Sequence, residues 1–136
     1  MASYNKYTNG VDALVKAINA GTDSYKVALT NTVNASDTTF TAGTSDLATG
    51  NGYTAGGNAA TVSSASTSSG TFKLVLNSPS TWTATGAVGP FRYAILYDST
   101  TNNPLGYWDY GSSISLANTD TFTVTLDGTN GVFTVA

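Results

Sequence analysis

The 136-residue sequence contains no cysteine, no histidine, no glutamate and no glutamine. Without histidine or cysteine, the chain has no neutral-pH proton shuttle, no thiolate nucleophile and no soft metal ligand. Its acids are eight scattered aspartates, and its bases are four lysines and one arginine. A serine–lysine or paired-aspartate mechanism is compatible with that set, but the composition favours a protein with no catalytic residues, no cofactor and no metal site.

Charge is also scarce. Charged residues make up 10% of the chain and the net charge is −3, whereas soluble domains usually carry about a quarter of charged residues. The cations are dispersed, and a nucleic-acid binder needs a basic stripe. No run approaches the ~20 apolar residues of a membrane-spanning helix. The N-terminus lacks the charged-then-apolar pattern of a signal peptide. We therefore expect no nucleic-acid partner, no membrane partner, and synthesis in the cytoplasm.

Aromatic and small polar residues are abundant instead. The chain has eight Tyr, five Phe and two Trp, and roughly half of it is Ser, Thr, Asn and Gly. The aromatic content favours a folded protein over a disordered one. Thr suits exposed strand faces, and Asn and Gly suit turns. At this length a single domain over residues 1–136 is the natural expectation.

One helix is predicted near the N-terminus. Val11, Leu14, Val15 and Ile18 recur at helical spacing, and Gly21 follows as a stop signal. We expect a short helix at about residues 10–20 that covers an edge or a face of a sheet.

After residue 21 the apolar period changes from helical spacing to two. Alternation and turn signals predict strands over residues 24–31, 59–66, 71–77, 81–85, 91–98, 105–110, 121–127 and 132–136. Short strands at this spacing predict a mainly β protein, a β-sandwich or jelly roll. A single helix cannot supply the crossovers of a parallel sheet.

Two hairpins are expected among these strands. In the first, residues 91–98 pair with 105–110, in a register that runs from Tyr97 opposite Leu105 to Arg92 opposite Tyr110. Both faces of this hairpin are then largely apolar, as expected for a central pair of strands that is buried on both sides or covered on one side by a partner. In the second, a Gly-Thr-Asn-Gly turn at residues 128–131 joins the last two strands.

Asp109 lies between two aromatic residues of the first hairpin. A buried carboxylate is costly unless it is paired or hydrogen-bonded. Arg92 and nearby Thr and Tyr hydroxyls are the expected partners, and the expected role is structural.

Residues 32–58 form a long connection without periodicity. A connection of this length is usually functional or mobile, which makes it a candidate contact loop or arm. Its glycine run at 50–57 has the spacing G-x-G-x-x-x-G and not that of a nucleotide loop, so we interpret it as a tight loop anchored by Tyr53. Asp37 and Asp46 do not form a calcium-binding array and are interpreted as solvated turn aspartates.

Aromatic side chains are the best candidates for an interface, because each offers a large contact area with few rotors. The same rings could stack against sugars. The candidate interface residues are Phe40, Leu47, Tyr53, Trp108 and Tyr110.

Several segments, taken in order, resemble small virion proteins of tailed bacteriophages, of the capsid cement or decoration type. They are YKVALTN at 25–31, GYTAGG at 52–57, GPFRYAILYD at 89–98, PLGYWDYG at 104–111 and TFTV at 121–124. The resemblance extends from about residue 10 to the end of the chain, and no binding residue is carried over from it.

The resemblance implies a β-sandwich or jelly roll that forms a homo-oligomer, a dimer or a trimer. It also implies the major capsid protein as partner and the capsid surface of the virion as location. The alternative is a tail or head-fibre adhesin, a carbohydrate-binding module that docks host glycans through exposed aromatics.

Overall fold

The structure is a computed structural model that describes residues 2–8, 10 and 20–136. The prediction of a mainly β protein is confirmed. The helix predicted over about residues 10–20 falls on residues 11–19, which lie outside the described residues. The strands are β1 (Ser3–Lys6), β2 (Tyr25–Thr30), β3 (Asn58–Ala59), β4 (Val62–Ser68), β5 (Thr71–Leu76), β6 (Trp82–Thr83), β7 (Val88–Asp98), β8 (Asn103–Leu116), β9 (Thr121–Phe122) and β10 (Phe133–Val135).

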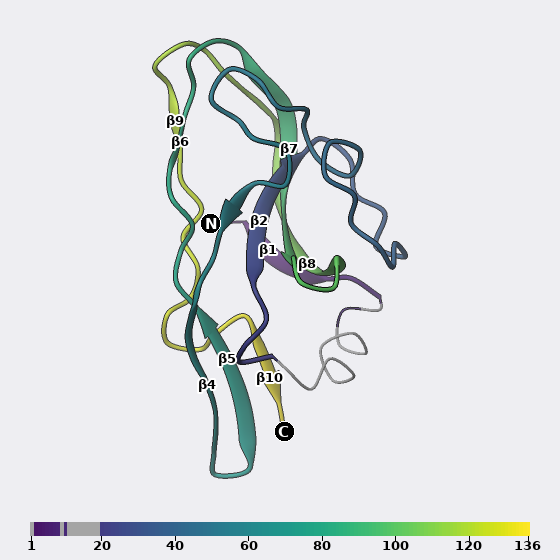
Figure 1. Ribbon diagram of the computed structural model, residues 1–136, viewed down its shortest axis with the longest axis vertical. Coiled ribbons are helices and arrows are strands. Elements are labelled where there is room, and N and C mark those ends of the chain that lie inside the picture. The colour runs from purple at the N-terminus through teal and green to yellow at the C-terminus, as the bar shows by residue number, and fades with distance from the viewer. Residues whose placement is uncertain (1, 9, 11–19) are drawn as a thin grey trace.

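These strands form three antiparallel sheets. The largest has five strands in the order β1-β8-β7-β2-β3, the second has three in the order β10-β5-β4, and the third pairs β6 with β9. Figure 1 shows the two smaller sheets along one side of the large sheet, and the start of the connection that follows β2 on the other side. We call these two sides of the large sheet its inner and outer faces.

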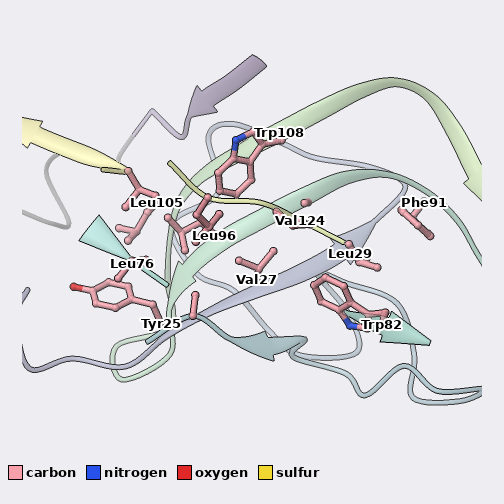
Figure 2. Packing of buried hydrophobic residues seen from close by; sticks show 14 of the residues in the cluster. Tyr25, Val27, Leu29, Leu76, Trp82, Phe91, Leu96, Leu105, Trp108 and Val124 are labelled. Carbon is pink, nitrogen blue, oxygen red and sulfur yellow. The ribbon is translucent and has the colours of Figure 1, made fainter. Parts of the chain in front are cut away.

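The main core fills the space between the sheets. Its inner-face residues include Tyr25, Val27 and Leu29 of β2, which are at most 2% exposed, as the period of two predicts. Leu74 of β5 and Trp82 of β6 belong to the same cluster, so the core is shared by all three sheets (Figure 2). Burial of each large apolar side chain contributes about 1.5–3 kcal/mol.

The β7–β8 hairpin follows the predicted register in its middle. Tyr93 lies opposite Asp109 and Ile95 opposite Tyr107. The predicted ends of the register are wrong, because irregularities shift it on both sides of this stretch. Towards the turn, Tyr97 faces Pro104 rather than Leu105.

At the other end of the hairpin, Phe91 faces Ile114, so the predicted opposition of Arg92 and Tyr110 is also lost. Phe91 is fully buried in the main core, whereas Arg92 and Tyr93 both contact outer-face residues. An irregularity of this kind is typical of a β-bulge, which re-aims consecutive side chains.

The predicted second hairpin is wrong. Strand β9 pairs with β6, and β10 pairs with β5, so the two halves belong to different sheets. The turn itself is present, because Asp127 Oδ1 accepts hydrogen bonds from the backbone N–H groups of Thr129 and Asn130. In the segment between β9 and β10, Val124 and Leu126 are buried in the main core. Core packing with distant strands therefore decides the pairing, and the local turn does not.

Strand β1 has no counterpart among the predicted elements. Its four residues are Ser-Tyr-Asn-Lys, which show no apolar alternation, and it pairs with β8 about a hundred residues away. Tyr4 provides its hydrophobic contact, with its ring centroid 4.7 Å from that of Trp108. The ring lies over Gly106, where a Cβ atom would overlap it.

The long connection after β2 folds back on the outer face of the large sheet. Phe40 is 4% exposed and stacks on Tyr97 with ring centroids 3.8 Å apart. These two rings form a second core cluster with Tyr7, Ala28 and Ile95. The central strands are therefore covered on both faces, as the apolar pattern of the first hairpin predicts.

A buried carboxylate fixes the end of this connection. Asp46 is 7% exposed and accepts hydrogen bonds from the Tyr53 hydroxyl at 2.5 Å and from the N–H groups of Gly56 and Gly43, both at 2.6 Å. Leu29 of β2 donates its N–H to the Tyr53 oxygen at 3.0 Å. The prediction that Tyr53 is an anchor is confirmed. The interpretation of Asp46 as a solvated turn residue is wrong, because three donors replace its water.

Candidate functional site

The five residues predicted as an interface all contribute to internal packing. Phe40, Tyr53 and Trp108 are 4%, 2% and 9% exposed. Leu47 and Tyr110 are half-buried and pack against the main core. A sequence does not distinguish a core aromatic from a surface one, because both occur at alternate positions of strands. A contact surface must therefore be sought among other side chains.

Three tyrosines on the outer face form a continuous row across three strands. Tyr7 follows β1, Tyr107 lies on β8 and Tyr93 on β7. The Tyr7 and Tyr107 rings meet edge to face at 5.5 Å, and the Tyr107 and Tyr93 rings meet edge to face at 5.9 Å. We call these three residues the tyrosine row. Tyr93 and Tyr107 are half-buried, so part of each ring faces outward.

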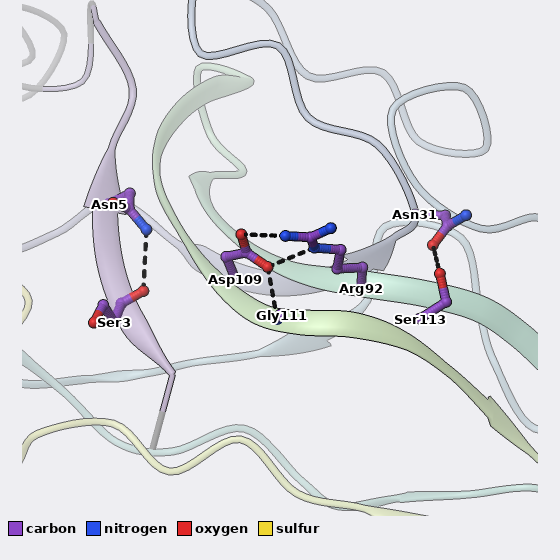
Figure 3. A network of polar contacts seen from close by, with 7 residues as sticks. All are labelled: Ser3, Asn5, Asn31, Arg92, Asp109, Gly111 and Ser113. Atoms are coloured by element: carbon purple, nitrogen blue, oxygen red, sulfur yellow. Dashed lines mark hydrogen bonds and ion pairs between the residues drawn. The ribbon is translucent and has the colours of Figure 1, made fainter.

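An ion pair lies next to the row. Arg92 Nε and Nη2 donate to the two carboxylate oxygens of Asp109 at 2.7 and 3.0 Å (Figure 3). The side chains are 38% and 31% exposed. The guanidinium carbon also lies 5.4 Å from the ring centroid of Tyr93, at the distance of a cation–π contact.

The pair has a fixed geometry and charge. The Arg92 hydrogen bonds, and then the N–H of Gly111, lower the pKa of Asp109 below its ordinary value. The Asp109 carboxylate in turn raises the pKa of Arg92. Both groups therefore stay charged near neutral pH and cancel each other. The prediction that Arg92 is the structural partner of Asp109 is confirmed.

Small polar groups surround this surface. Ser3 and Asn5 of β1 are exposed, and the Asn5 amide donates to the Ser3 carbonyl at 3.1 Å. On the other side, the Ser113 hydroxyl donates to the Asn31 side-chain oxygen at 2.8 Å (Figure 3). The surface thus has an aromatic centre with a polar rim, which is the usual organisation of a protein interface.

A cavity of about 280 Å³ opens beside the tyrosine row, between the folded-back connection and the sheet. Tyr7, Phe40 and Ile95 contribute its apolar wall, and Asn34 and Asp37 contribute polar groups. Burial, and then the charge of Asp37, raise the pKa of Tyr7. The Tyr7 hydroxyl therefore remains protonated at any physiological pH.

The described residues contain neither a candidate metal-binding cluster nor a helix that could span a membrane. In the part of the chain that the structure describes, no group of three or more His, Cys, Asp or Glu side chains could hold a metal ion. Within the same ranges, no helix is long and apolar enough to cross a membrane. The rings and the ion pair are instead held in fixed orientations by one another and by the sheet.

The sequence contains a signal for this surface that residue type alone does not reveal. The predicted register already places Tyr93 opposite Asp109 and Ile95 opposite Tyr107, which puts both tyrosines on one face of the hairpin. The contribution of Tyr7 was not predictable, because it depends on the unpredicted strand β1. No protein-family model, no curated protein and no solved structure matches the chain, so this surface is interpreted from its own geometry.

Proposed function

We propose that this chain is a non-enzymatic structural protein of a virion, a decoration or cement protein that stabilises a tailed-phage head by binding the major capsid protein. Its docking face is centred on Tyr93 and Tyr107 of the tyrosine row and on the Arg92–Asp109 pair, whereas Tyr7, which is 3% exposed, supports the Tyr107 ring from within. The observation that carries this proposal is the row itself, an aromatic strip held on the part of the outer face that the folded-back connection leaves uncovered.

The residue types on the docking face support protein binding. Tyrosine and arginine are enriched among the residues that contribute most to binding at interfaces. The edge-to-face ring contacts and the two hydrogen bonds of the ion pair hold these side chains in place before a partner arrives. Less side-chain entropy is therefore lost on binding.

The resemblance to phage decoration proteins supports the same conclusion. The segments that carry it include GPFRYAILYD and PLGYWDYG. These two segments supply Arg92, Tyr93, Tyr107 and Asp109, which make up most of the docking face. The proposed location is the capsid surface of the virion, after synthesis in the host cytoplasm.

The proposed architecture is a β-sandwich, the class to which jelly rolls belong. It is supported by the core shared between the large sheet and the two small ones. A two-layered molecule of this kind offers one outer face to a shell while its core stays closed. Repetition of many copies on the shell would strengthen a modest individual affinity through avidity.

The decisive experiment is co-sedimentation of the protein with phage heads that lack it. The wild-type chain should sediment with the heads and raise their resistance to heat. A Tyr93→Ala/Tyr107→Ala variant should bind at least ~10-fold more weakly, because central aromatic side chains dominate interface energies. Tyr93→Phe/Tyr107→Phe keeps both rings and serves as the matched control.

Two results would contradict this proposal. One is a wild-type chain that does not sediment with heads. The other is an alanine variant that folds normally, by circular dichroism, and binds heads as the wild type does. A cryo-electron microscopy map of decorated heads would then identify the face that contacts the shell.

The alternative is a carbohydrate-binding module of a tail or head fibre. Half-exposed Tyr93 and Tyr107 rings beside Arg92, Asp109 and Asn5 also suit a sugar, which stacks on rings and hydrogen-bonds to planar polar groups. A saccharide signal on a glycan array that disappears with the Tyr93→Ala/Tyr107→Ala variant would favour this alternative.

A further inference from the structure

One strand has a long open edge. Strand β4 (Val62–Ser68) has seven residues and pairs only with β5. No described residue pairs with its other edge. The remaining sheet margins are shorter: β1 has four residues, β10 three, and β3, β6 and β9 two each. An open edge presents unpaired N–H and C=O groups to any extended chain.

The edge of β4 carries little of the usual protection. Its sequence is VSSASTS, without charge and without proline. Natural proteins usually guard such an edge with lysine, proline, a bulge or very short length. The only device present is an irregularity between Val62 and Ser64, which leaves the stretch from Ser64 to Ser68 regular.

The turn at the end of β4 determines which residues face the open edge. Ser69 and Gly70 have φ angles of 51° and 79°, and they join the opposed residues Ser68 and Thr71. In a two-residue hairpin of this kind the flanking pair is hydrogen-bonded, and hydrogen-bonded pairs alternate along the ladder. Ser66 and Ser68 therefore bond to β5, whereas Ala65 and Thr67 direct their N–H and C=O groups to the open edge.

We propose that this edge binds the β4 strand of a second copy of the chain. The two strands run antiparallel about a two-fold axis beside Ser66, so that Ala65 of each copy pairs with Thr67 of the other. The two three-stranded sheets then become one sheet of six strands. The role of this contact, to link neighbouring copies on a shell, rests on the proposed function. The strand pairing itself does not depend on that function.

A second copy fits this edge better than a different strand does. The side chains are small, so two β4 strands approach without overlap. A two-fold contact also pairs the β4 edges of both copies at once, so that neither β4 edge stays open. A charged residue, Lys73, lies opposite Ser66 on β5, and its ammonium donates to the Thr129 carbonyl at 3.0 Å. The two copies of Lys73 lie three strand spacings apart, about 14 Å, beyond the ~8 Å screening length of physiological salt.

The test is the mass of the purified full-length chain in solution, measured by light scattering over a range of concentrations. The wild type should reach twice the 13.9 kDa of one chain. Thr67→Pro removes an outward N–H without removing a bond to β5, and should give a monomer with an unchanged circular dichroism spectrum. Thr67→Val keeps the N–H and serves as the matched control, which should dimerise.

Hydrogen exchange provides a measurement that needs no variant. In the wild type, the amides of Ala65 and Thr67 should exchange more slowly as protein concentration rises, whereas other exposed amides should not change. The proposal is overturned by a wild-type chain that is monomeric throughout, by a Thr67→Pro chain that still dimerises, or by exchange at these amides that is independent of concentration.

The two proposals fail in distinguishable ways. The Tyr93→Ala/Tyr107→Ala variant should still dimerise, because its docking face lies on the five-stranded sheet, whereas β4 belongs to the three-stranded sheet. A wild-type dimer that does not bind heads would contradict the proposed function and leave the strand contact standing. A monomer that does bind heads would contradict the strand contact alone.

Discussion

At the scale of single residues, the hydrogen bonds of Tyr53 illustrate how one side chain fixes a long connection. Its hydroxyl accepts from the Leu29 N–H of β2 and donates to Asp46. Tyr53 itself is 2% exposed, so water cannot replace either bond. One oxygen atom thus links β2 directly to the buried Asp46 of the connection.

The first prediction follows from this geometry. Tyr53→Phe should lower the free energy of unfolding by about 1–3 kcal/mol, because the Leu29 N–H is left buried without an acceptor. Urea unfolding monitored by fluorescence measures the change. Tyr93→Phe removes a hydroxyl from a half-buried side chain of the outer face and should stay within ~0.5 kcal/mol of the wild type. Equal effects of the two substitutions would contradict this account.

A second residue-scale feature is a pair of neighbouring aspartates. Asp98 is 2% exposed and accepts hydrogen bonds from the N–H groups of Thr100 and Thr101. Burial raises the pKa of Asp98 to about 6, and the hydrogen bond that a protonated Asp98 makes to the Asp23 side chain contributes to the same shift. The Asp23 Oδ2 atom is buried and has no partner among the described residues. A proton on Asp98 would supply the missing donor.

This raised pKa predicts a pH dependence of stability. Between about pH 4 and pH 6 the folded state keeps the proton of Asp98 and the unfolded state releases it. The contribution of this proton to the free energy of unfolding is fully present below about pH 4, and it is lost as the pH rises through 6. Two pKa units correspond to at most ~3 kcal/mol.

Urea unfolding at several pH values tests this prediction. Asp98→Asn keeps the acceptor for Thr100 and Thr101 but cannot ionise, so it should gain stability relative to the wild type as the pH rises from 4 to 7. Parallel curves for the two proteins would show that Asp98 has an ordinary pKa.

At the scale of elements, β1 depends on a glycine in its neighbour. A Cβ atom on Gly106 of β8 would overlap the ring and hydroxyl of Tyr4. Gly106→Ala should therefore displace Tyr4 from Trp108 and destabilise the protein by about 1–3 kcal/mol. Thermal unfolding and hydrogen exchange of the β1 amides measure the effect.

Two controls accompany this substitution. Gly128→Ala should be nearly neutral, because nothing lies within 4 Å of the added atom. In the Tyr4→Ala background, Gly106→Ala should cost much less than it does alone, since the overlapping ring is gone. Additive effects of the two substitutions would mean that the ring does not occupy this space.

Elements whose signals are local were predicted well. Strand β2 shows a clean alternation of Tyr25, Val27 and Leu29, and the middle of the β7–β8 register follows from its turn and its apolar faces. Strand β1 and the pairing of β9 and β10 depend on partners distant in the sequence, which local patterns do not encode. The candidate site was missed for a related reason: burial of Phe40 and Tyr53 is decided by the folded-back connection, not by residue type.

At the scale of the whole molecule, the faces and edges of the sheets have different roles. The inner face of the large sheet closes the core, the covered part of the outer face holds the connection, and the uncovered part presents the tyrosine row. The open edge of β4 lies in a different sheet. The proposed contacts with a shell and with a neighbouring copy therefore use different sheets of the molecule.

The pairing of β1 with β8 also constrains how the chain can fold during synthesis. Tyr4 lies opposite Trp108, and Tyr25 of β2 lies opposite Asp98. Strand β1 therefore cannot pair until the chain has been made through β8, about a hundred residues later, whereas the β4–β5 hairpin needs only its own turn. Late closure of this kind is typical of proteins with many long-range pairings. The largest sheet of this protein is therefore completed only after β8 has been made.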